Sequence, residues 1–204
     1  MNRRMLITAA FAAAVAVGSA VPAAAKASLG ELSRYLNSIQ SATGEFTQVN
    51  PDGTISTGQI YIKRPGRVRF EYAPPTPSLV MAGGGQVAVF DPKSNQPPEQ
   101  YPLSQTPLNL ILARNVDLGR ANMVRSHTSD ATTTTVLAQD PQRPEYGTIE
   151  LKFTDSPVEL RQWIITDSSG AKTTVILGGL NKVGDLRPSL FNIVQEAQKR
   201  GFRG

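Results

Sequence analysis

Apolar and polar residues alternate along several short stretches of this chain, and this spacing constrains its fold more than any other feature. In the clearest stretch, residues 67–72, Val68, Phe70 and Tyr72 fall on one face and charged residues on the other. A period of two is typical of a β-strand with one buried face. Because helices do not alternate with single strands, the pattern predicts a mainly β protein with an antiparallel sheet rather than a doubly wound α/β fold.

Further strands are expected where the same alternation recurs between turns rich in Pro, Gly or Ser. The expected stretches begin at Phe46 and then cover residues 59–63, 78–82, 86–90, 133–139, 148–154, 159–166 and 172–177. Asp91-Pro92 begins a polar loop, and residues 125–130 around His127 form another. Gly83-Gly84-Gly85 is interpreted as a tight link between strands, or as room for a bulky ligand beside the sheet.

Two segments have helical spacing instead. Ser28 followed by Glu31 forms a capping-box pattern, so the first helix should begin there and end near residues 40–43. Thr106 before Pro107 predicts a second, very short helix that is apolar on nearly all sides. Such a helix either packs into an ordinary core or covers an apolar ligand.

The N-terminus has the three-part layout of an export signal. Arg3 and Arg4 precede an apolar run of small residues, and Ala23 and Ala25 fit the cleavage rule for such segments. We expect residues 1–25 to be removed and the protein to act in the periplasm. The remaining residues 26–204 are enough for one domain, and we expect its tail, about residues 195–204, to be disordered.

Few groups suited to catalysis or metal binding are present. The chain has no Cys and one His, and its 16 acidic residues are scattered without a calcium-loop spacing. The Gly-rich segment lacks the Lys-Ser/Thr of a phosphate-binding loop, and no run of basic residues points to nucleic acid. We therefore expect no catalytic residues, no cofactor and no metal, although paired carboxylates distant in sequence leave a hydrolase open.

Residues 62–72 read I-K-R-P-G-R-V-R-F-E-Y, and this string resembles the hallmark of the LolA family of periplasmic lipoprotein carriers. The order of other segments agrees: F-T-Q from Phe46, V-A-V-F-D-P ending at Pro92, and T-P-L from Thr106. Where many relatives carry Trp, this chain has Val87 and Ala88. The resemblance implies an incomplete, open antiparallel β-barrel whose apolar concave face is covered by a lid of helices.

The resemblance also implies the function. A carrier of this family holds the acyl chains of a lipoprotein released by an ATP-driven inner-membrane complex and delivers it to an outer-membrane acceptor. Arg64 matches the family arginine that ties the lid closed through backbone carbonyls, a task suited to the five donors of a guanidinium. We expect such a carrier to be a monomer and not to bind nucleic acid.

Strand parity and helical spacing select the residues that would contact the cargo. The expected cavity residues are Val68, Phe70, Leu79, Met81, Val87 and Val89. The expected lid residues are Leu32, Leu36, Ile39, Leu108, Ile111 and Leu112. The alternatives are a periplasmic lipid or glycolipid binder of the same fold, or a carboxylate-dependent hydrolase.

Overall fold

The computed structural model describes residues 26–75 and 77–202, so the expected export segment lies outside the described residues. The strands are β1 Ser41–Val49, β2 Ile55–Lys63, β3 Arg67–Tyr72, β4 Leu79–Gly83, β5 Gln86–Phe90, β6 Glu99–Pro102, β7 Val124–Ser129, β8 Thr133–Gln139, β9 Thr148–Asp155, β10 Val158–Thr166, β11 Lys172–Leu177 and β12 Asn181–Lys182. The helices are α1 Leu29–Ser38, α2 Asn109–Leu112 and α3 Ile193–Lys199, with 3₁₀ turns η1 Leu103–Gln105, η2 Pro144–Tyr146 and η3 Pro188–Phe191.

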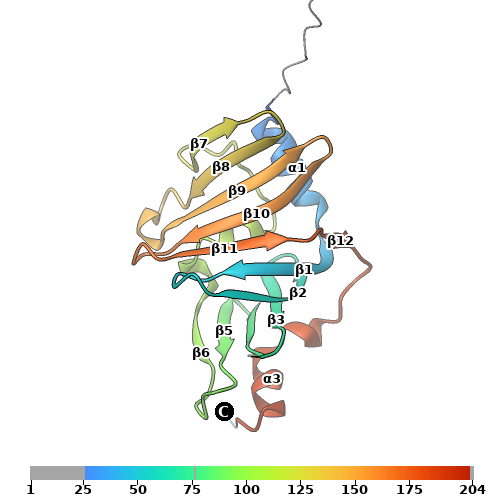
Figure 1. Ribbon diagram of the computed structural model, residues 1–204, viewed down its shortest axis with the longest axis vertical. Helices are drawn as coiled ribbons and strands as arrows, with labels where there is room; N and C mark the ends of the chain where they lie inside the picture. Colours follow the sequence, from blue (N-terminus) through green and yellow to red (C-terminus); the bar gives the residue numbers. More distant parts are fainter. Residues whose placement is uncertain (1–25, 76, 203–204) are drawn as a thin grey trace, which may run out of the picture.

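All of these strands belong to one antiparallel sheet that does not close into a barrel. Its order is β6-β5-β4-β3-β2-β1-β11-β10-β9-β8-β7, and β12 pairs with β1 beside this path. Strands β6 and β7 are therefore its two edges. Figure 1 shows that the strands turn strongly from one half of the sheet to the other, with α1 behind the sheet and α3 near β3 and β5. The expected open antiparallel architecture is confirmed.

The first helix begins as its sequence predicts. The Ser28 hydroxyl accepts a hydrogen bond from the Glu31 amide at 3.2 Å, and the Glu31 carboxylate accepts one from the Ser28 amide at 2.8 Å. These two bonds satisfy amide groups that the helix itself cannot pair. The helix ends at Ser38, slightly earlier than expected, and β1 follows almost at once.

The second helix is shorter than its sequence suggests. Thr106 does not cap it, because its hydroxyl donates to the Leu103 carbonyl at 2.9 Å, and α2 begins only at Asn109 after a turn over Pro107. The prediction of Thr106 as the capping residue is wrong. The local bond to Leu103 competes with capping, as Thr side chains commonly do in turns.

The segment around His127 forms edge strand β7 rather than the predicted loop. Its side chains are mostly polar, so no alternation distinguishes it from a loop. The His127 ring nitrogen lies 3.0 Å from the Ala27 carbonyl, which joins the start of the described chain to this edge. Burial, opposed by this hydrogen bond, lowers the pKa of His127. The ring therefore has a structural partner.

The C-terminal segment, predicted as disordered from residue 195, instead forms α3 on the face of the sheet opposite α1. Ile193 packs with Leu79, Met81, Ala88 and Phe90 in a second, smaller core. The carbonyl of Phe191 approaches Gly83 so closely that a Cβ there would lie 2.0 Å from it. The bare glycine thus accommodates the chain's own backbone and not a bulky ligand, while Gly84 and Gly85 form the tight link between β4 and β5 that was the other interpretation.

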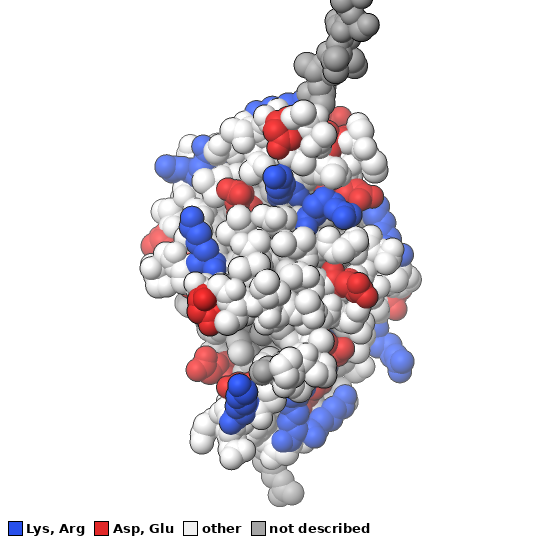
Figure 2. All heavy atoms as spheres, viewed as in Figure 1, with Lys and Arg blue, Asp and Glu red and all other residues white. Residues whose placement is uncertain are grey.

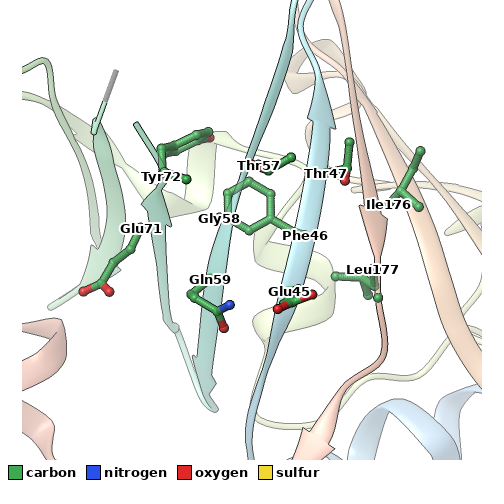
Figure 3. A pocket seen from close by; sticks show the side chains of 12 residues that line it. Glu45, Phe46, Thr47, Thr57, Gly58, Gln59, Glu71, Tyr72, Ile176 and Leu177 are labelled. Atoms are coloured by element: carbon green, nitrogen blue, oxygen red, sulfur yellow. The ribbon is translucent and has the colours of Figure 1, made fainter. Parts of the chain in front are cut away.

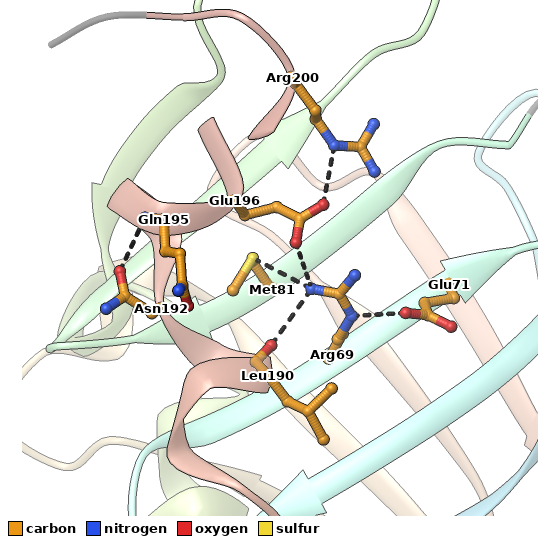
Figure 4. Close-up of polar contacts among 8 residues, drawn as sticks. All are labelled: Arg69, Glu71, Met81, Leu190, Asn192, Gln195, Glu196 and Arg200. Carbon is orange, nitrogen blue, oxygen red and sulfur yellow. Dashed lines mark hydrogen bonds and ion pairs between the residues drawn. The ribbon is translucent and has the colours of Figure 1, made fainter. Parts of the chain in front are cut away.

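A buried ionic cluster fixes α3 to the sheet (Figure 4). The Arg69 guanidinium donates to the Glu196 carboxylate at 3.2 Å and to the Leu190 carbonyl at 3.2 Å, and its Nε donates to Glu71 at 2.6 Å. Glu196 also accepts from Arg200 at 3.0 Å. On the same side of the sheet, Lys63 pairs with Asp185 and donates to the Leu186 carbonyl at 2.6 Å. These cations face away from the lids.

Stability should therefore depend on pH through Glu196. Burial raises the pKa of this carboxyl, but hydrogen bonds from Arg200 and Arg69 outweigh it, so the net pKa lies below its ordinary value of 4.5. Such a group stabilises the fold above about pH 4.5, and the contribution is lost as pH falls through the lower folded value. We expect Glu196→Gln to cost about 1–3 kcal/mol at neutral pH and to flatten the acid limb of stability. Urea unfolding from pH 7 to pH 3 measures this, and equal acid slopes in both proteins would contradict it.

The surface opposite the lids carries charges of both signs. Figure 2 shows Lys and Arg scattered among Asp and Glu over this face, without a broad patch of one sign. Within residues 26–75 and 77–202, no helix is long and apolar enough to span a membrane.

Candidate functional site

An apolar cavity of about 460 Å³ lies on the concave face of the sheet. This volume falls within the roughly 300–1,000 Å³ typical of small-ligand sites. Its apolar lining comes from both halves of the sheet and from the turn before α2: Phe70, Tyr72, Val80, Val87, Leu108, Trp163, Ile165 and Val175. Polar residues from three loops, including Gln105, Tyr146 and Asp167, form part of its boundary. The cavity is thus an apolar compartment with a partly polar opening.

Aromatic rings form the wall at the centre of the sheet. The Phe46 ring meets Phe70 and Tyr72 edge to face, at centroid distances of 5.3 and 5.1 Å. Phe70 continues the series to Trp163 at 6.3 Å. Edge-to-face pairs of this kind stabilise a packed arrangement beyond simple burial. Phe70, Tyr72 and Trp163 of this series line the cavity directly.

Helices α1 and α2 cover the concave face as lids. Leu32, Leu36 and Ile39 of the first lid are buried, as are Ile111 and Leu112 of the second. Leu108 is half-buried and lies on the cavity itself. All six predicted lid residues therefore belong to, or pack against, the main core between the lids and the sheet.

Arg64 joins the two lids. It lies just after β2, and its guanidinium donates to the Leu36 carbonyl at the end of α1. It also donates to the Ala113 carbonyl after α2, at 3.1 Å from Nε and 2.5 Å from an Nη. The side chain thus pairs with carbonyls at the ends of both helices, although the Leu36 carbonyl also accepts from the Ile39 amide at 3.2 Å, and its charge suits the negative end of α1. Burial lowers the pKa of Arg64.

Asn37 completes this connection, although the sequence pattern did not single it out. Its side-chain oxygen accepts from Arg64 at 3.0 Å and from the Val116 amide at 2.9 Å, while its nitrogen donates to the Val116 carbonyl at 2.8 Å. The Gly66 amide adds a bond to the Leu112 carbonyl at 2.8 Å. An amide next to the buried Leu36 in the last turn of the first lid is the signal that could have identified Asn37. We call Arg64, Asn37 and these carbonyls the latch.

Comparison with protein-family models shows which family this chain belongs to. The family model described as "Outer membrane lipoprotein carrier protein LolA" matches residues 37–194. The chain belongs to the LolA family. The match includes the cavity, Arg64 and most of the lid residues.

Curated LolA relatives extend over nearly the full chain at modest identity. An outer-membrane lipoprotein carrier protein from Cupriavidus pinatubonensis is 26% identical over 204 residues, covering 94% of each chain. A protein of the same name from Chromohalobacter salexigens is 28% identical over 198 residues, covering 89% of this chain and 92% of its own.

Solved structures with a similar arrangement are more distant. A LolA superfamily protein from Nitrosomonas europaea is 14% identical, with a TM-score of 0.43, and the alignment covers 81% of this chain and 98% of that one. An uncharacterized conserved protein from Thermus thermophilus is 10% identical, with a TM-score of 0.48 over 81% of this chain and 93% of that one.

The predicted cavity residues divide between the two faces of the sheet. Val68, Phe70 and Val87 lie on the concave side and belong to the core beneath the lids. Val89 lines an adjoining groove on the same side. Leu79 and Met81 lie on the opposite face, in the small core under α3. The prediction that these two residues face the cavity is wrong.

The register of β4 explains the error. Val80 is opposite Phe70 and Ala82 is opposite Val68, so Val80 and Ala82 share the concave face. Every residue of β4 except Val80 is buried, because α3 covers its other face. A strand with two buried faces lacks the alternation that parity requires. Val80 is the cavity residue that strand parity missed.

A second hollow, of about 610 Å³, lies around β1, β2, β3 and β11 (Figure 3). The side chains of Glu45, Gln59 and Glu71 stand in a row across three adjacent strands, away from the lids. Two carboxylates and an amide suit polar contacts rather than acyl chains. The smaller cavity, with its largely apolar lining, is therefore the better candidate for an apolar ligand.

Ionisable groups form no metal centre in the part of the chain that the structure describes, since no three His, Asp or Glu residues there could hold an ion together. The carboxylate at the cavity opening, Asp167, has a specific local role. It accepts hydrogen bonds from the Ser169 hydroxyl at 2.6 Å and from the Ser169 and Ala171 amides. The Ser169 hydroxyl bond is the main cause of its lowered pKa. Asp167 shapes the β10–β11 turn.

Proposed function

We propose that this protein is a periplasmic carrier that holds the acyl chains of lipoproteins and delivers them to an outer-membrane acceptor. The observation that carries the proposal is an apolar cavity on the concave face, bordered by the turn before α2, together with two lids on that face that a single buried arginine joins. Burying an acyl chain is worth about 0.8 kcal/mol per CH₂, so an apolar compartment suits this cargo. The names of the curated relatives agree with it.

Loading requires the lids to move. The cavity is partly covered, and Leu108 both lines it and packs against the core beneath the lids. A lipoprotein with several acyl chains would displace such apolar side chains and separate the carbonyls that Arg64 joins. The energy that the latch provides in the empty state then opposes the retention of cargo, which favours release to an acceptor.

The direction of transport follows from affinity. The carrier would take cargo from an ATP-driven inner-membrane release complex and pass it to an acceptor that binds it more tightly, since a ligand moves toward the state with the better affinity. The closing latch lowers the carrier's own affinity for cargo. A carrier that does not itself hydrolyse ATP can therefore move cargo from one membrane to the other.

Depletion of the protein tests this role in cells. Lipoproteins destined for the outer membrane should accumulate at the inner membrane after depletion, and expression of the wild-type chain should restore their sorting. Membrane fractionation followed by detection of lipoproteins measures the distribution. Correct sorting throughout depletion would contradict delivery by this protein.

A further inference from the structure

The concave face continues beyond the apolar cavity into an open groove of about 600 Å³ at the end of β1, β2 and β3. The cavity and the groove share three lining residues, Gln48, Tyr72 and Val80. The Tyr72 hydroxyl donates to the Gln48 side-chain oxygen at 2.7 Å across their boundary. This Tyr72–Gln48 pair is a bar between two compartments of one continuous surface.

Gly58 makes the bar possible. It lies on β2 between Phe46 of β1 and Tyr72 of β3 in the sheet register. A Cβ at this position would lie 2.8 Å from the Phe46 ring. Because no side chain rises from the middle strand, the Tyr72 side chain can reach a residue two strands away.

The chemistry of the concave face changes at the bar. On the cavity side, β1 presents Ala42 and Phe46 and β2 presents Ile60, all buried. On the groove side, the same faces of these strands carry Gln48 and Ser56. One face of a continuous pair of strands thus changes from apolar to polar at Tyr72.

The polar residues beyond the bar form a connected hydrogen-bond chain. The Gln48 amide nitrogen donates to the Asn50 side-chain oxygen at 2.6 Å. The Asn50 nitrogen then donates to Thr54 at 2.9 Å and to Ser56 at 3.3 Å. Hydrogen-bonding groups on one side and apolar groups on the other suit an extended polypeptide. The opposite side of the groove is mainly apolar, with Pro74, Pro75, Val80 and Val89, and also carries Ser78 and Lys93.

We propose that the groove holds the polypeptide segment that follows the acylated residue of the cargo, with the Tyr72–Gln48 bar at the junction of lipid and peptide. The inference rests on the proposed function. Continuity of the groove with the cavity supports a ligand that has both parts covalently joined. Among the described residues that line the groove, Lys93 is the one basic side chain, so a headgroup phosphate is the competing occupant that the test must separate.

Two synthetic probes separate the peptide contribution from the lipid contribution. One is a diacylglyceryl-cysteine followed by about ten further residues, which reach roughly 33 Å when extended, and the other is the same diacylglyceryl-cysteine as a simple amide. Wild-type protein should bind the lipopeptide about tenfold more tightly in a fluorescence displacement assay, equivalent to roughly 1.4 kcal/mol. Equal affinities in the wild type would overturn the groove while leaving the carrier proposal intact. Failure to bind either probe would overturn the carrier proposal.

A variant that fills the groove tests whether the peptide part of the probe binds there. Ser56→Tyr should remove the preference for the lipopeptide and leave the affinity for the simple amide within about twofold, because the cavity is unchanged. Gln59→Tyr, on the opposite face of the same strand, is the matched control and should keep the preference. Circular dichroism and thermal unfolding check that both variants fold.

A photoreactive residue placed third after the cysteine of the lipopeptide gives a second measurement that does not depend on a substitution. Cross-links at the β1–β2 turn or at the β3–β4 connection support the groove. Cross-links confined to Glu45, Gln59 or Glu71 would overturn it. Competition by phosphatidylglycerol that is lost in Lys93→Gln would assign the groove to a headgroup and also overturn the proposal.

Discussion

Replacement of Arg64 by Leu should leave a protein that receives lipoprotein but transfers it at least about tenfold more slowly than wild type. The guanidinium donates to carbonyls of both lid segments, and hydrogen bonds from charged groups contribute about 1.5–3 kcal/mol each. These bonds stabilise the closed, empty state. Without these bonds the closed, empty state is less stable relative to the cargo-bound state. If the difference is about 1.4 kcal/mol, release should slow by roughly tenfold.

The measurement is a reconstituted assay in two stages, with loading from inner-membrane vesicles and release to outer-membrane vesicles scored separately. Arg114→Leu is the matched control, because it removes the same group from an exposed position beside the latch. Arg64→Lys should restore little, since an ammonium cannot engage carbonyls in the same planar arrangement. If Arg64→Leu releases cargo at the wild-type rate, Arg64 has no role in the transfer step.

The Leu108→Asp variant should lose affinity for acyl chains about 100-fold, which corresponds to roughly 2.7 kcal/mol. Leu108 lies on the cavity and is half-buried, so an aspartate there can remain hydrated in the empty protein. Acyl chains would displace that water and leave a charge against hydrocarbon. The loss should therefore appear in ligand affinity more than in the free energy of unfolding.

Displacement of a fluorescent fatty acid measures the affinity, and urea unfolding measures stability. Ser104→Asp introduces the same charge at a nearby exposed position and should behave like wild type. If Leu108→Asp binds acyl chains with wild-type affinity, the cavity lined by Leu108 is not where the chains are held.

The sequence predicted those parts of the fold that have one local cause. The Ser28–Glu31 capping box specifies the start of α1 without help from the rest of the chain. The alternation in residues 67–72 correctly placed Val68 and Phe70 on the concave face, because the charged residues between them face the other way. The contacts of Arg64 with backbone carbonyls also match what the family resemblance implied.

The remaining errors come from tertiary packing. Strand parity predicts the wrong face for Leu79 and Met81 because β4 is apolar throughout and α3, expected from the sequence to be a disordered tail, covers its second face. Both errors have the same cause, because the element that covers each face of β4 determines which face borders the cavity. Strand β7 was missed for the opposite reason, because an edge strand with polar side chains has no buried face to detect.

The Arg64 segment has a role on both faces of the sheet. Arg64 joins the lids on the concave side, while Lys63 and Arg69 hold the C-terminal segment on the other. Alternation along β2 and β3, together with the turn between them, separates these contacts. Substitutions of Arg69 should therefore affect stability before transport, and substitutions of Arg64 should affect transport first.

Native mass spectrometry of the protein purified from the periplasm tests the carrier role most directly. A carrier should show a population whose added mass equals that of an acylated lipoprotein, and this population should increase in Arg64→Leu because release is slowed. An empty cavity in both proteins, or a cavity filled solely by free phospholipid, would contradict carriage of lipoproteins.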